Sequence, residues 1–137
     1  MAEIILSNRM QALTDMVTPG TVITDVGCDH GFVSVYLVQK GISPRVIAMD
    51  VRSGPLEHAR EHIREYGLED RIETRLSDGL HSLKTGEAAG MICAGMGGPL
   101  MEKILTEGRE QAKGFRELIL QPQSEICLLY TSDAADD

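Results

Sequence analysis

Acidic residues and glycines gather where the apolar runs of this chain end, a pattern typical of a ligand site. Carboxylates accept hydrogen bonds from hydroxyl and amino groups, and glycines let a backbone approach a ligand closely. In a parallel sheet, ligands bind at the carboxyl ends of the strands. We therefore expect one crevice formed from five strand ends, with contributions from Asp25, Gly27, Cys28, Asp29, His30 and Gly31, then Asp50 and Val51, then Ser77, Asp78 and Gly79, then Ala94, Gly95, Met96, Gly97 and Gly98, and finally Gln121.

The loop after the first apolar run disfavours a dinucleotide. A G-x-G-x-x-G frame that begins at Gly27 would require glycines at positions 29 and 32, where the chain has Asp29 and Phe32. The Asp29 carboxylate would repel a pyrophosphate held in the same tight loop. No GK[ST] sequence follows a glycine run, so a P-loop is absent as well.

A nucleoside that carries positive charge suits these acids better. Asp50 lies 23 residues beyond Gly27, close to the spacing of about 20 residues at which an acid binds ribose hydroxyls. S-adenosylmethionine combines a ribose and an adenine with a sulfonium and an ammonium group. We expect Asp25 and Asp29 to face its cationic end. Asp50 would then bind the ribose, and Asp78 the adenine amino group.

Each of these residues also has a purely structural interpretation, which the sequence leaves open. Gly27 fits a simple turn, and Asp50 fits a solvated strand end. Asp29 fits the N-cap of the helix that follows, and His30 fits a residue that bonds locally at the same helix start. The glycines after residue 94 fit a tight turn alone.

The elements that must position these residues alternate between helices and short strands. Such an order argues for a parallel sheet covered by helices on both faces, with right-handed crossovers. The fold class is therefore α/β, doubly wound and Rossmann-like. We predict strands at 21–26, 45–50, 71–76, 88–94 and 118–121, a first helix capped by Ser7 and ended by Pro19-Gly20, and further helices at 32–40, 55–66 and 99–105.

Length and composition indicate one ordinary globular domain. The chain has 137 residues, of which 42% are hydrophobic and 25% charged, values typical of a soluble protein with a single core. No apolar run approaches the roughly 18 residues that span a bilayer, and the first residues do not fit a signal peptide. Three cysteines without a CxxC pair indicate reduced thiols and no metal site. We expect a cytoplasmic protein with no membrane partner.

The charge of the chain argues against a nucleic-acid partner. The formal net charge is −8, whereas phosphate binding usually requires a basic face. Without residues 127–137, which contain three acids and no base, 18 acidic and 13 basic residues remain. The predicted helix at 55–66 does not change this balance. We interpret it as a solvated face rather than an RNA-binding patch, because glutamates alternate with its basic side chains His58, Arg60, His62 and Arg64.

Six segments nevertheless resemble one family of RNA-modifying enzymes. They are "LSNRMQALTDMV", "DVGCDHG", "AMDVRSGPLEHA", "RLSDGL", "AGMGGPLMEKIL" and "LILQPQSE", between Leu6 and Glu125. Together they are similar to the bacterial tRNA (adenine-N1)-methyltransferases of the TrmK type, which modify nucleotide 22 of tRNA. "DHG", "GPL" and "AGMGG" are specific to that group. The resemblance implies a class I fold, S-adenosylmethionine as cofactor and tRNA as partner.

The resemblance also implies roles for individual residues. Asp29 is our candidate to stabilise the cationic product base, with His30 as the second candidate. The absence of an Asn-Pro-Pro-Tyr type motif fits attack by a ring nitrogen. The glycines at 95, 97 and 98 would let the backbone approach the transferred methyl and the flipped base. The expected substrate contacts are Arg9, Gly97, Gly98 and Gln121.

The end of the chain departs from the family pattern. Members of the family continue after Gln123 through further strands and a helical C-terminal region, which "CLLYTSDAADD" does not match. We expect a methyltransferase core at 1–126 and a tail at 127–137 that is disordered or artefactual. Two alternatives stay open: a methyltransferase for a small molecule or protein, and an inactive fragment that binds cofactor. The oligomeric state is open too.

Overall fold

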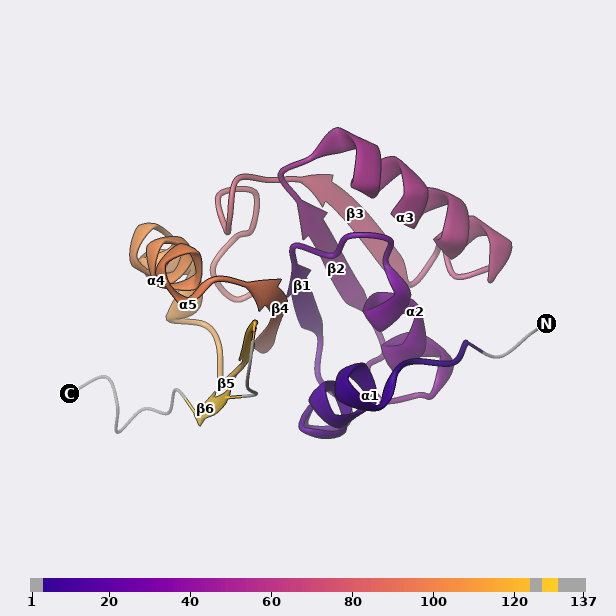
Figure 1. The fold of residues 1–137 in the computed structure, drawn as a ribbon, viewed down its shortest axis with the longest axis horizontal. Coiled ribbons are helices and arrows are strands. Elements are labelled where there is room, and N and C mark those ends of the chain that lie inside the picture. Colours follow the sequence, from indigo (N-terminus) through magenta and orange to yellow (C-terminus); the bar gives the residue numbers. More distant parts are fainter. Residues whose placement is uncertain (1–3, 124–126, 131–137) are drawn as a thin grey trace.

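Six strands form a single sheet in the computed structural model, which describes residues 4–123 and 127–130, the last four for their backbone alone. The strand order is β3-β2-β1-β4-β5-β6 (Figure 1). β1 to β5 are parallel to one another, and β6 is antiparallel to β5. This confirms the predicted doubly wound α/β class. The strands are β1 Ile23–Val26, β2 Val46–Asp50, β3 Ile72–Leu76, β4 Gly90–Met96, β5 Glu117–Pro122 and β6 Cys127–Tyr130.

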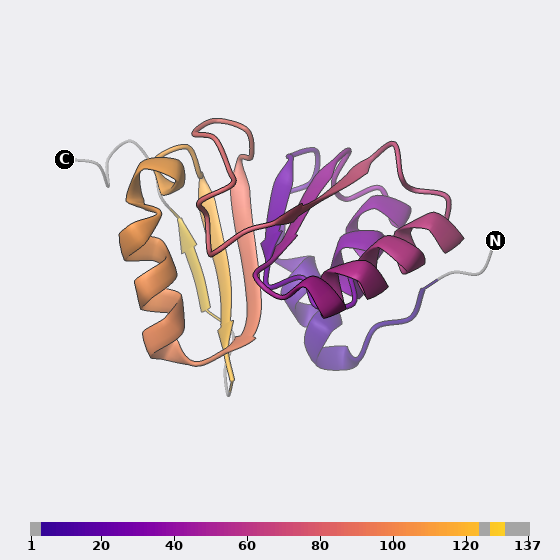
Figure 2. The same cartoon turned by 90° about the horizontal axis from the view of Figure 1, so that it is seen from above.

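The helices cover both faces of the sheet. α1, α2 and α3 lie on one face, and α4 and α5 lie on the other (Figure 2). This arrangement leaves the carboxyl ends of the parallel strands free to carry a site between the two helical layers. The helices are α1 Asn8–Asp15, α2 Phe32–Gln39, α3 Ser53–Glu65, α4 Gly98–Glu107 and α5 Arg109–Ala112.

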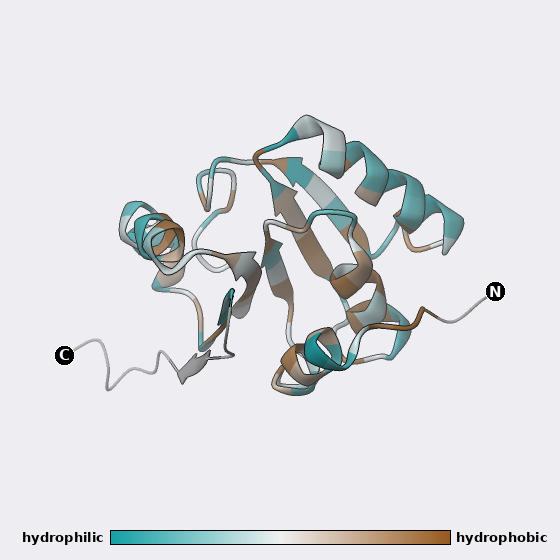
Figure 3. Ribbon diagram, in the orientation of Figure 1, coloured by the Kyte–Doolittle hydropathy of each residue, from teal (hydrophilic) through white to brown (hydrophobic). Residues whose placement is uncertain are grey.

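The central strands are buried on both sides because each helical layer has its own core, and they are mostly apolar, with Thr24 and Asp25 of β1 as buried polar exceptions. In β2, Val46 and Ala48 pack into the core beneath α1 to α3. Ile47 and Met49 pack into the core on the opposite face. Strands buried on both faces are near-continuous apolar runs, and Figure 3 shows β2 in brown near a largely teal α3. The apolar runs in the sequence therefore located the sheet.

Local signals explain how the first helices begin and end. The Ser7 hydroxyl accepts a hydrogen bond from the Met10 amide at 3.3 Å, as expected for an N-cap. α1 ends at Asp15, four residues before Pro19, because the Met16 amide donates to Leu13 in a tighter turn. α3 begins at Ser53 rather than at Pro55, so Pro55 lies in the first turn of the helix. Proline is tolerated in that turn because the backbone amides there have no partner within the helix.

Some strand boundaries differ from the prediction. β1 begins at Ile23 rather than at position 21, and β4 runs from Gly90 to Met96 rather than over 88–94. A register shift between Ala94 and Met96 keeps β4 paired with β5, and Gly95 adopts a positive φ of 78° there. A bulge of this kind was not evident in the glycine pattern. The short helix α5 was not predicted either.

The backbone of residues 127–130 has a partner that the sequence did not indicate. β6 pairs antiparallel with β5, from Leu120 opposite Cys127 to Glu117 opposite Tyr130. Regular pairing therefore exists where the sequence predicted a disordered or artefactual tail, and β5 is not an edge strand. The boundary at residue 126 stays a prediction, and residues 131–137 lie outside the described part. Across the described ranges, no helix has the length and apolar character needed to cross a membrane.

Candidate active site

A cleft of about 710 Å³ lies at the carboxyl ends of β1 to β5. It brings together all the predicted cofactor residues except Gly31, together with two of the predicted substrate residues. Five strand ends therefore share one site, as the sequence predicted. The predicted residues on its wall are Asp25, Gly27, Cys28, Asp29, Asp50, Val51, Ser77, Asp78, Gly79, Ala94, Gly95, Met96, Gly97 and Gln121.

The loop between β1 and α2 is held against β2 by its own backbone. The amides of Gly27 and Cys28 both donate to the Met49 carbonyl, at 2.8 and 2.9 Å. Gly27 has a φ of 75°, a left-handed conformation that favours glycine. These contacts hold the loop across the end of β2 and thereby help to position Asp29 at the cleft.

Asp50 is the acid that joins the two loops at this end of the cleft. Its Oδ2 accepts from the Asp29 amide at 3.0 Å. Its Oδ1 accepts from the Arg52 amide at 2.9 Å and from the Arg52 Nε at 3.2 Å. Burial alone would raise the pKa of Asp50, but the hydrogen bonds from Arg52 and Asp29 outweigh it, so the pKa lies below its ordinary value. Asp50 is therefore an ionised, nearly buried carboxylate at the cleft wall, rather than a solvated strand end.

Arg52 is a cleft residue that the sequence analysis did not identify. Its guanidinium folds back onto the Asp50 carboxylate and also lies 3.8 Å from Asp29 Oδ1. Most of the side chain remains exposed, at 61%, so a ligand could displace it without disturbing the core. The sequence signal was weak, because a basic residue two positions after a strand-end acid is common on protein surfaces.

Asp25 is a buried acid on the inner wall of the cleft. The Ser34 hydroxyl donates to its Oδ2 at 2.8 Å. Burial raises the pKa of Asp25 from 3.8 to about 7, and the charges of Asp50 and Asp29 add to that rise, while the Ser34 hydrogen bond opposes it. Near neutral pH this carboxyl therefore lies close to its titration midpoint, and a cationic ligand would favour its ionised form.

Asp29 presents an exposed carboxylate at the mouth of the cleft. It has a φ of 52°, and 60% of its side chain is exposed. Its Oδ1 lies 3.8 Å from both His30 Nε2 and Arg52 Nη2. The N-cap of α2 is Gly31, with no side-chain cap hydrogen bond. The interpretation of Asp29 as a side-chain helix cap is therefore wrong, and its carboxylate instead lies between His30 and Arg52.

Four predicted site residues do not line this cleft. A Cβ on Gly31 would lie 3.0 Å from the Ala59 Cβ, so close packing of α2 on α3 explains this glycine. Arg9 donates to the Gln123 carbonyl, next to the cleft wall. Gly98 lines a neighbouring apolar hollow between α4 and β5. His30 lies outside the cleft among other rings. The functional roles proposed for these four stay predictions, as do the roles proposed for the residues that line the cleft.

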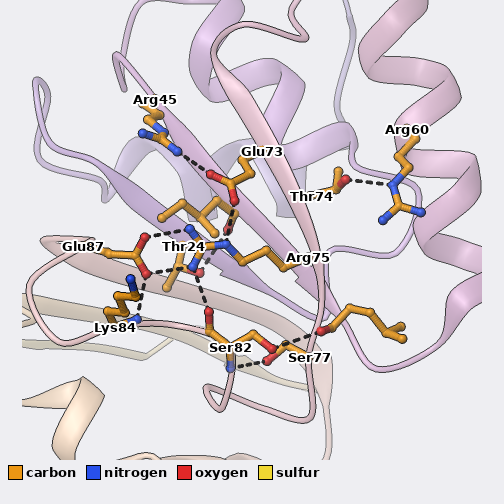
Figure 4. A network of polar contacts seen from close by, with 12 residues as sticks. Thr24, Arg45, Arg60, Glu73, Thr74, Arg75, Ser77, Ser82, Lys84 and Glu87 are labelled. Carbon is orange, nitrogen blue, oxygen red and sulfur yellow. Dashed lines mark hydrogen bonds and ion pairs between the residues drawn. The ribbon is translucent and has the colours of Figure 1, made fainter.

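The loop after β3 is held in place by an arginine beneath it. The Arg75 guanidinium donates to both carboxylate oxygens of Glu87, at 2.7 and 2.6 Å, and to the Ser82 carbonyl at 2.8 Å (Figure 4). The Ser77 hydroxyl in turn donates to the Gly79 carbonyl and accepts from the Ser82 amide. Charge-assisted bidentate pairs of this kind are strong and directional. They fix the loop that carries Asp78 to the cleft.

The far side of the cleft offers backbone and one unpaired amide. A Cβ on Gly95 would meet nothing within 4 Å, so the bulge there leaves open space. Gln121 is 4% exposed, and its Nε2 has no hydrogen-bond partner among the described residues. A buried donor without a partner is costly, which makes Gln121 a candidate for binding an acceptor on a ligand.

Apolar side chains complete the wall, and sequence reasoning missed them. They come from α1, α2, α4 and the end of β1, where they resemble ordinary core positions. No sequence signal distinguishes them from such positions. The apolar lining residues are Met10, Val26, Val33, Leu100 and Ile104, and the polar Gln123 lies beside them. In the described part of the chain, no group of three or more His, Cys, Asp or Glu residues has the arrangement of a metal site.

Comparison with known proteins relates this geometry to one enzyme class. A family model described as a methyltransferase domain matches residues 6–131. The chain is 37% identical over 122 residues to the tRNA (adenine(22)-N(1))-methyltransferase of Bacillus subtilis. A crystal structure of the B. subtilis m1A22 tRNA methyltransferase TrmK superimposes with a TM-score of 0.84 at 36% identity, over 88% of this chain and 51% of that one.

A second solved structure adds a bound ligand to the comparison. It is a putative tRNA (m1A22) methyltransferase of Streptococcus pneumoniae in complex with S-adenosyl-L-methionine. It matches with a TM-score of 0.83 at 34% identity, over 86% of this chain and 56% of that one. The B. subtilis comparison covers 89% of this chain and 51% of the relative. The chain thus spans about half the length of the relatives it matches.

We predict that Asp25 makes the stability of the protein depend on pH. Between about pH 4 and pH 7 the folded state keeps a proton on Asp25 that the unfolded state has released, because the pKa rises from 3.8 to about 7 on folding. The free energy of unfolding should therefore fall as the pH rises through this window, by at most about 1.4 kcal/mol per pH unit.

Asp25→Asn provides the matched comparison, since the amide oxygen still accepts from Ser34. Urea denaturation at a series of pH values should show the variant gaining stability relative to the wild type between pH 4 and pH 7. The variant should be the more stable protein at pH 8. A stability difference that stays constant over this range would contradict the assignment of Asp25 as a buried, protonatable acid.

Proposed function

The chain belongs to the methyltransferase domain family, and from this premise we propose that it transfers a methyl group from S-adenosylmethionine to N1 of an adenine in tRNA, at position 22. The observation that carries the proposal is the acidic cleft, in which Asp25, Asp29, Asp50 and Asp78 lie on one wall opposite glycine-rich backbone. The names of the B. subtilis relatives support the choice of tRNA. A cytoplasmic location follows from that substrate.

The cleft residues fit the proposed cofactor chemically. Asp50 presents an ionised carboxylate at the end of β2, where vicinal ribose hydroxyls can donate to it. In the structure, the Arg52 guanidinium donates to the Asp50 carboxylate that the ribose hydroxyls would bind. Ribose binding therefore requires the exposed Arg52 side chain to move. Asp25 and Asp29 supply negative charge for the ammonium and sulfonium groups. Asp78 lies on the loop where it can accept from the adenine amino group.

The residues at the mouth suit methyl transfer to a ring nitrogen. When bound, S-adenosylmethionine supplies a methyl group whose carbon bonds to adenine N1 as the carbon–sulfur bond breaks, which leaves a cationic base. Asp29 holds an exposed carboxylate at this mouth and can stabilise the developing positive charge. Adenine N1 has a free lone pair, so no residue has to remove a proton before the attack.

The opposite wall suits a planar base. Gly95 and Gly97 line the cleft without side chains, and a base extruded from its stack can approach their backbone. The unpaired Nε2 of buried Gln121 can donate to a ring acceptor of that base. We therefore place the target adenine between Asp29 and Gln121.

The net charge favours a second candidate. At −8, the chain gives no electrostatic support for a polyanionic substrate. A methyltransferase that acts on a small molecule or a protein would not have this difficulty. Both candidates share the cofactor cleft and differ only in the methyl acceptor, so the identity of the acceptor is the property to measure.

The proposal predicts methyl transfer to one specific nucleotide. Unmodified tRNA transcripts should take up labelled methyl from S-adenosylmethionine, whereas a matched transcript with guanine at position 22 should not. The reason is that guanine N1 carries a proton and has no free lone pair. Binding of S-adenosylmethionine without transfer to either transcript would contradict the tRNA assignment and would leave the second candidate standing.

We also predict that the charge of Asp29 matters for the rate rather than for the fold. Asp29→Asn keeps the side-chain volume, and asparagine tolerates the left-handed φ of 52°. The rate of methyl transfer should fall by about 10²-fold or more, while the melting temperature should change little.

Asp29→Gly is the matched control for the loop, since it relieves the backbone strain and also removes the carboxylate. It should lose the same activity as Asp29→Asn. A normal transfer rate in either variant would show that the Asp29 charge plays no part in the reaction.

A further inference from the structure

Four aromatic rings gather on the surface beside the mouth of the cleft. They are His30 and Phe32 at the start of α2, and His58 and His62 on α3. We call this group the ring cluster. The whole chain has only four histidines, and the fold brings three of them together with Phe32.

The rings of the cluster are ordered by contacts with one another. Phe32 stacks on His62 with centroids 4.5 Å apart and an interplanar angle of 28°. His30 meets the edge of His58 at 5.1 Å. His62 Nδ1 is hydrogen-bonded to the His30 carbonyl at 2.8 Å. The cluster is therefore a preformed surface rather than a set of independent side chains.

Core packing does not account for this surface. Phe32 is 41% exposed, although an apolar ring gains most when it is buried. The His30 side chain is 41% exposed as well, and its Nε2 lies 3.8 Å from Asp29 Oδ1. Because Asp29 lines the cleft, the ring cluster continues the cleft wall outward onto the surface.

The surroundings of the ring cluster exclude two other kinds of ligand. In the part of the chain that the structure describes, the histidines do not form a group that could hold a metal ion. The charges on α3 alternate, and Arg60 is paired with Glu57, so this face offers no basic patch for phosphates. Exposed aromatic side chains, including histidine, are the groups on which unpaired bases stack.

We propose that the ring cluster stacks an unpaired base that flanks the target adenine in the RNA. This inference rests on the proposed function. Extruding a base from its stack leaves its neighbours without a stacking partner, and the ring cluster lies next to the mouth where the adenine would enter. It corrects our interpretation of α3 as a merely solvated face, since its two histidines point toward Phe32 and His30.

Variants that remove rings while keeping local contacts test the proposal. Phe32→Leu keeps an apolar side chain at the start of α2. In His62→Asn, the amide can still donate to the His30 carbonyl. The affinity of the double variant for a fluorescein-labelled tRNA transcript should fall about tenfold or more in an anisotropy titration, while its affinity for S-adenosylmethionine should not change. Each single variant should show a smaller loss.

An abasic RNA separates stacking from a structural effect. The transcript with abasic sites at nucleotides 21 and 23 should bind the wild type about tenfold more weakly, and the ring variants should then show no further loss. Tyr66→Leu is the matched control, because Tyr66 ends α3 on the side away from the cleft. It should bind both transcripts like the wild type.

The outcomes distinguish this inference from the proposed function. If the wild type binds the transcript and the ring variants bind it equally well, the ring cluster has no role in recognition, and the proposed function stands. Losses that stay the same on the abasic transcript would likewise overturn stacking. A wild type that binds S-adenosylmethionine but no transcript would overturn both.

Discussion

The Asp50 carboxylate joins the two loops from which the cleft is built. It accepts from the amide of Asp29, which fixes the loop after β1, and from the amide of Arg52, which fixes the entry to α3. A buried carboxylate requires such partners, since burying its charge alone is costly. In the proposed function, the same group also presents an acceptor to the ribose. The position of Asp29 and the start of α3 therefore depend on this side chain, together with the backbone hydrogen bonds from Gly27 and Cys28 to Met49.

This arrangement places several negative charges close together. Asp25 and Asp29 lie near Asp50, and their mutual repulsion adds to the effect of burial in raising the pKa of Asp25 to about 7. In the ligand-free protein, this cluster of acids lowers the stability near neutral pH. A ligand with an ammonium and a sulfonium group would relieve this repulsion, which supports the proposal that the cleft binds a cationic nucleoside.

The sequence predicted the sheet and most of the cleft because both depend on local patterns. Apolar runs such as Val46–Asp50 mark strands, and parallel strands bring their carboxyl ends together regardless of sequence distance. It did not predict that the Arg52 guanidinium pairs with the Asp50 carboxylate, because a long side chain can adopt many conformations. Nor did it predict the ring cluster, in which His30 and His62 meet only through the packing of α2 on α3. The pairing of β6 with β5 gave no local signal either.

Calorimetric titration of S-adenosylmethionine into the wild type and into Asp50→Asn tests the central claim most directly. The amide keeps the size of the side chain and an acceptor for the Arg52 backbone, but it loses the charge and the acceptor for the Asp29 amide. We predict that the wild type binds and that the variant binds about 1.5–3 kcal/mol more weakly. Asp15→Ala, a change on the exposed face of α1, should bind like the wild type. Equal affinity of the wild type and Asp50→Asn would contradict the account.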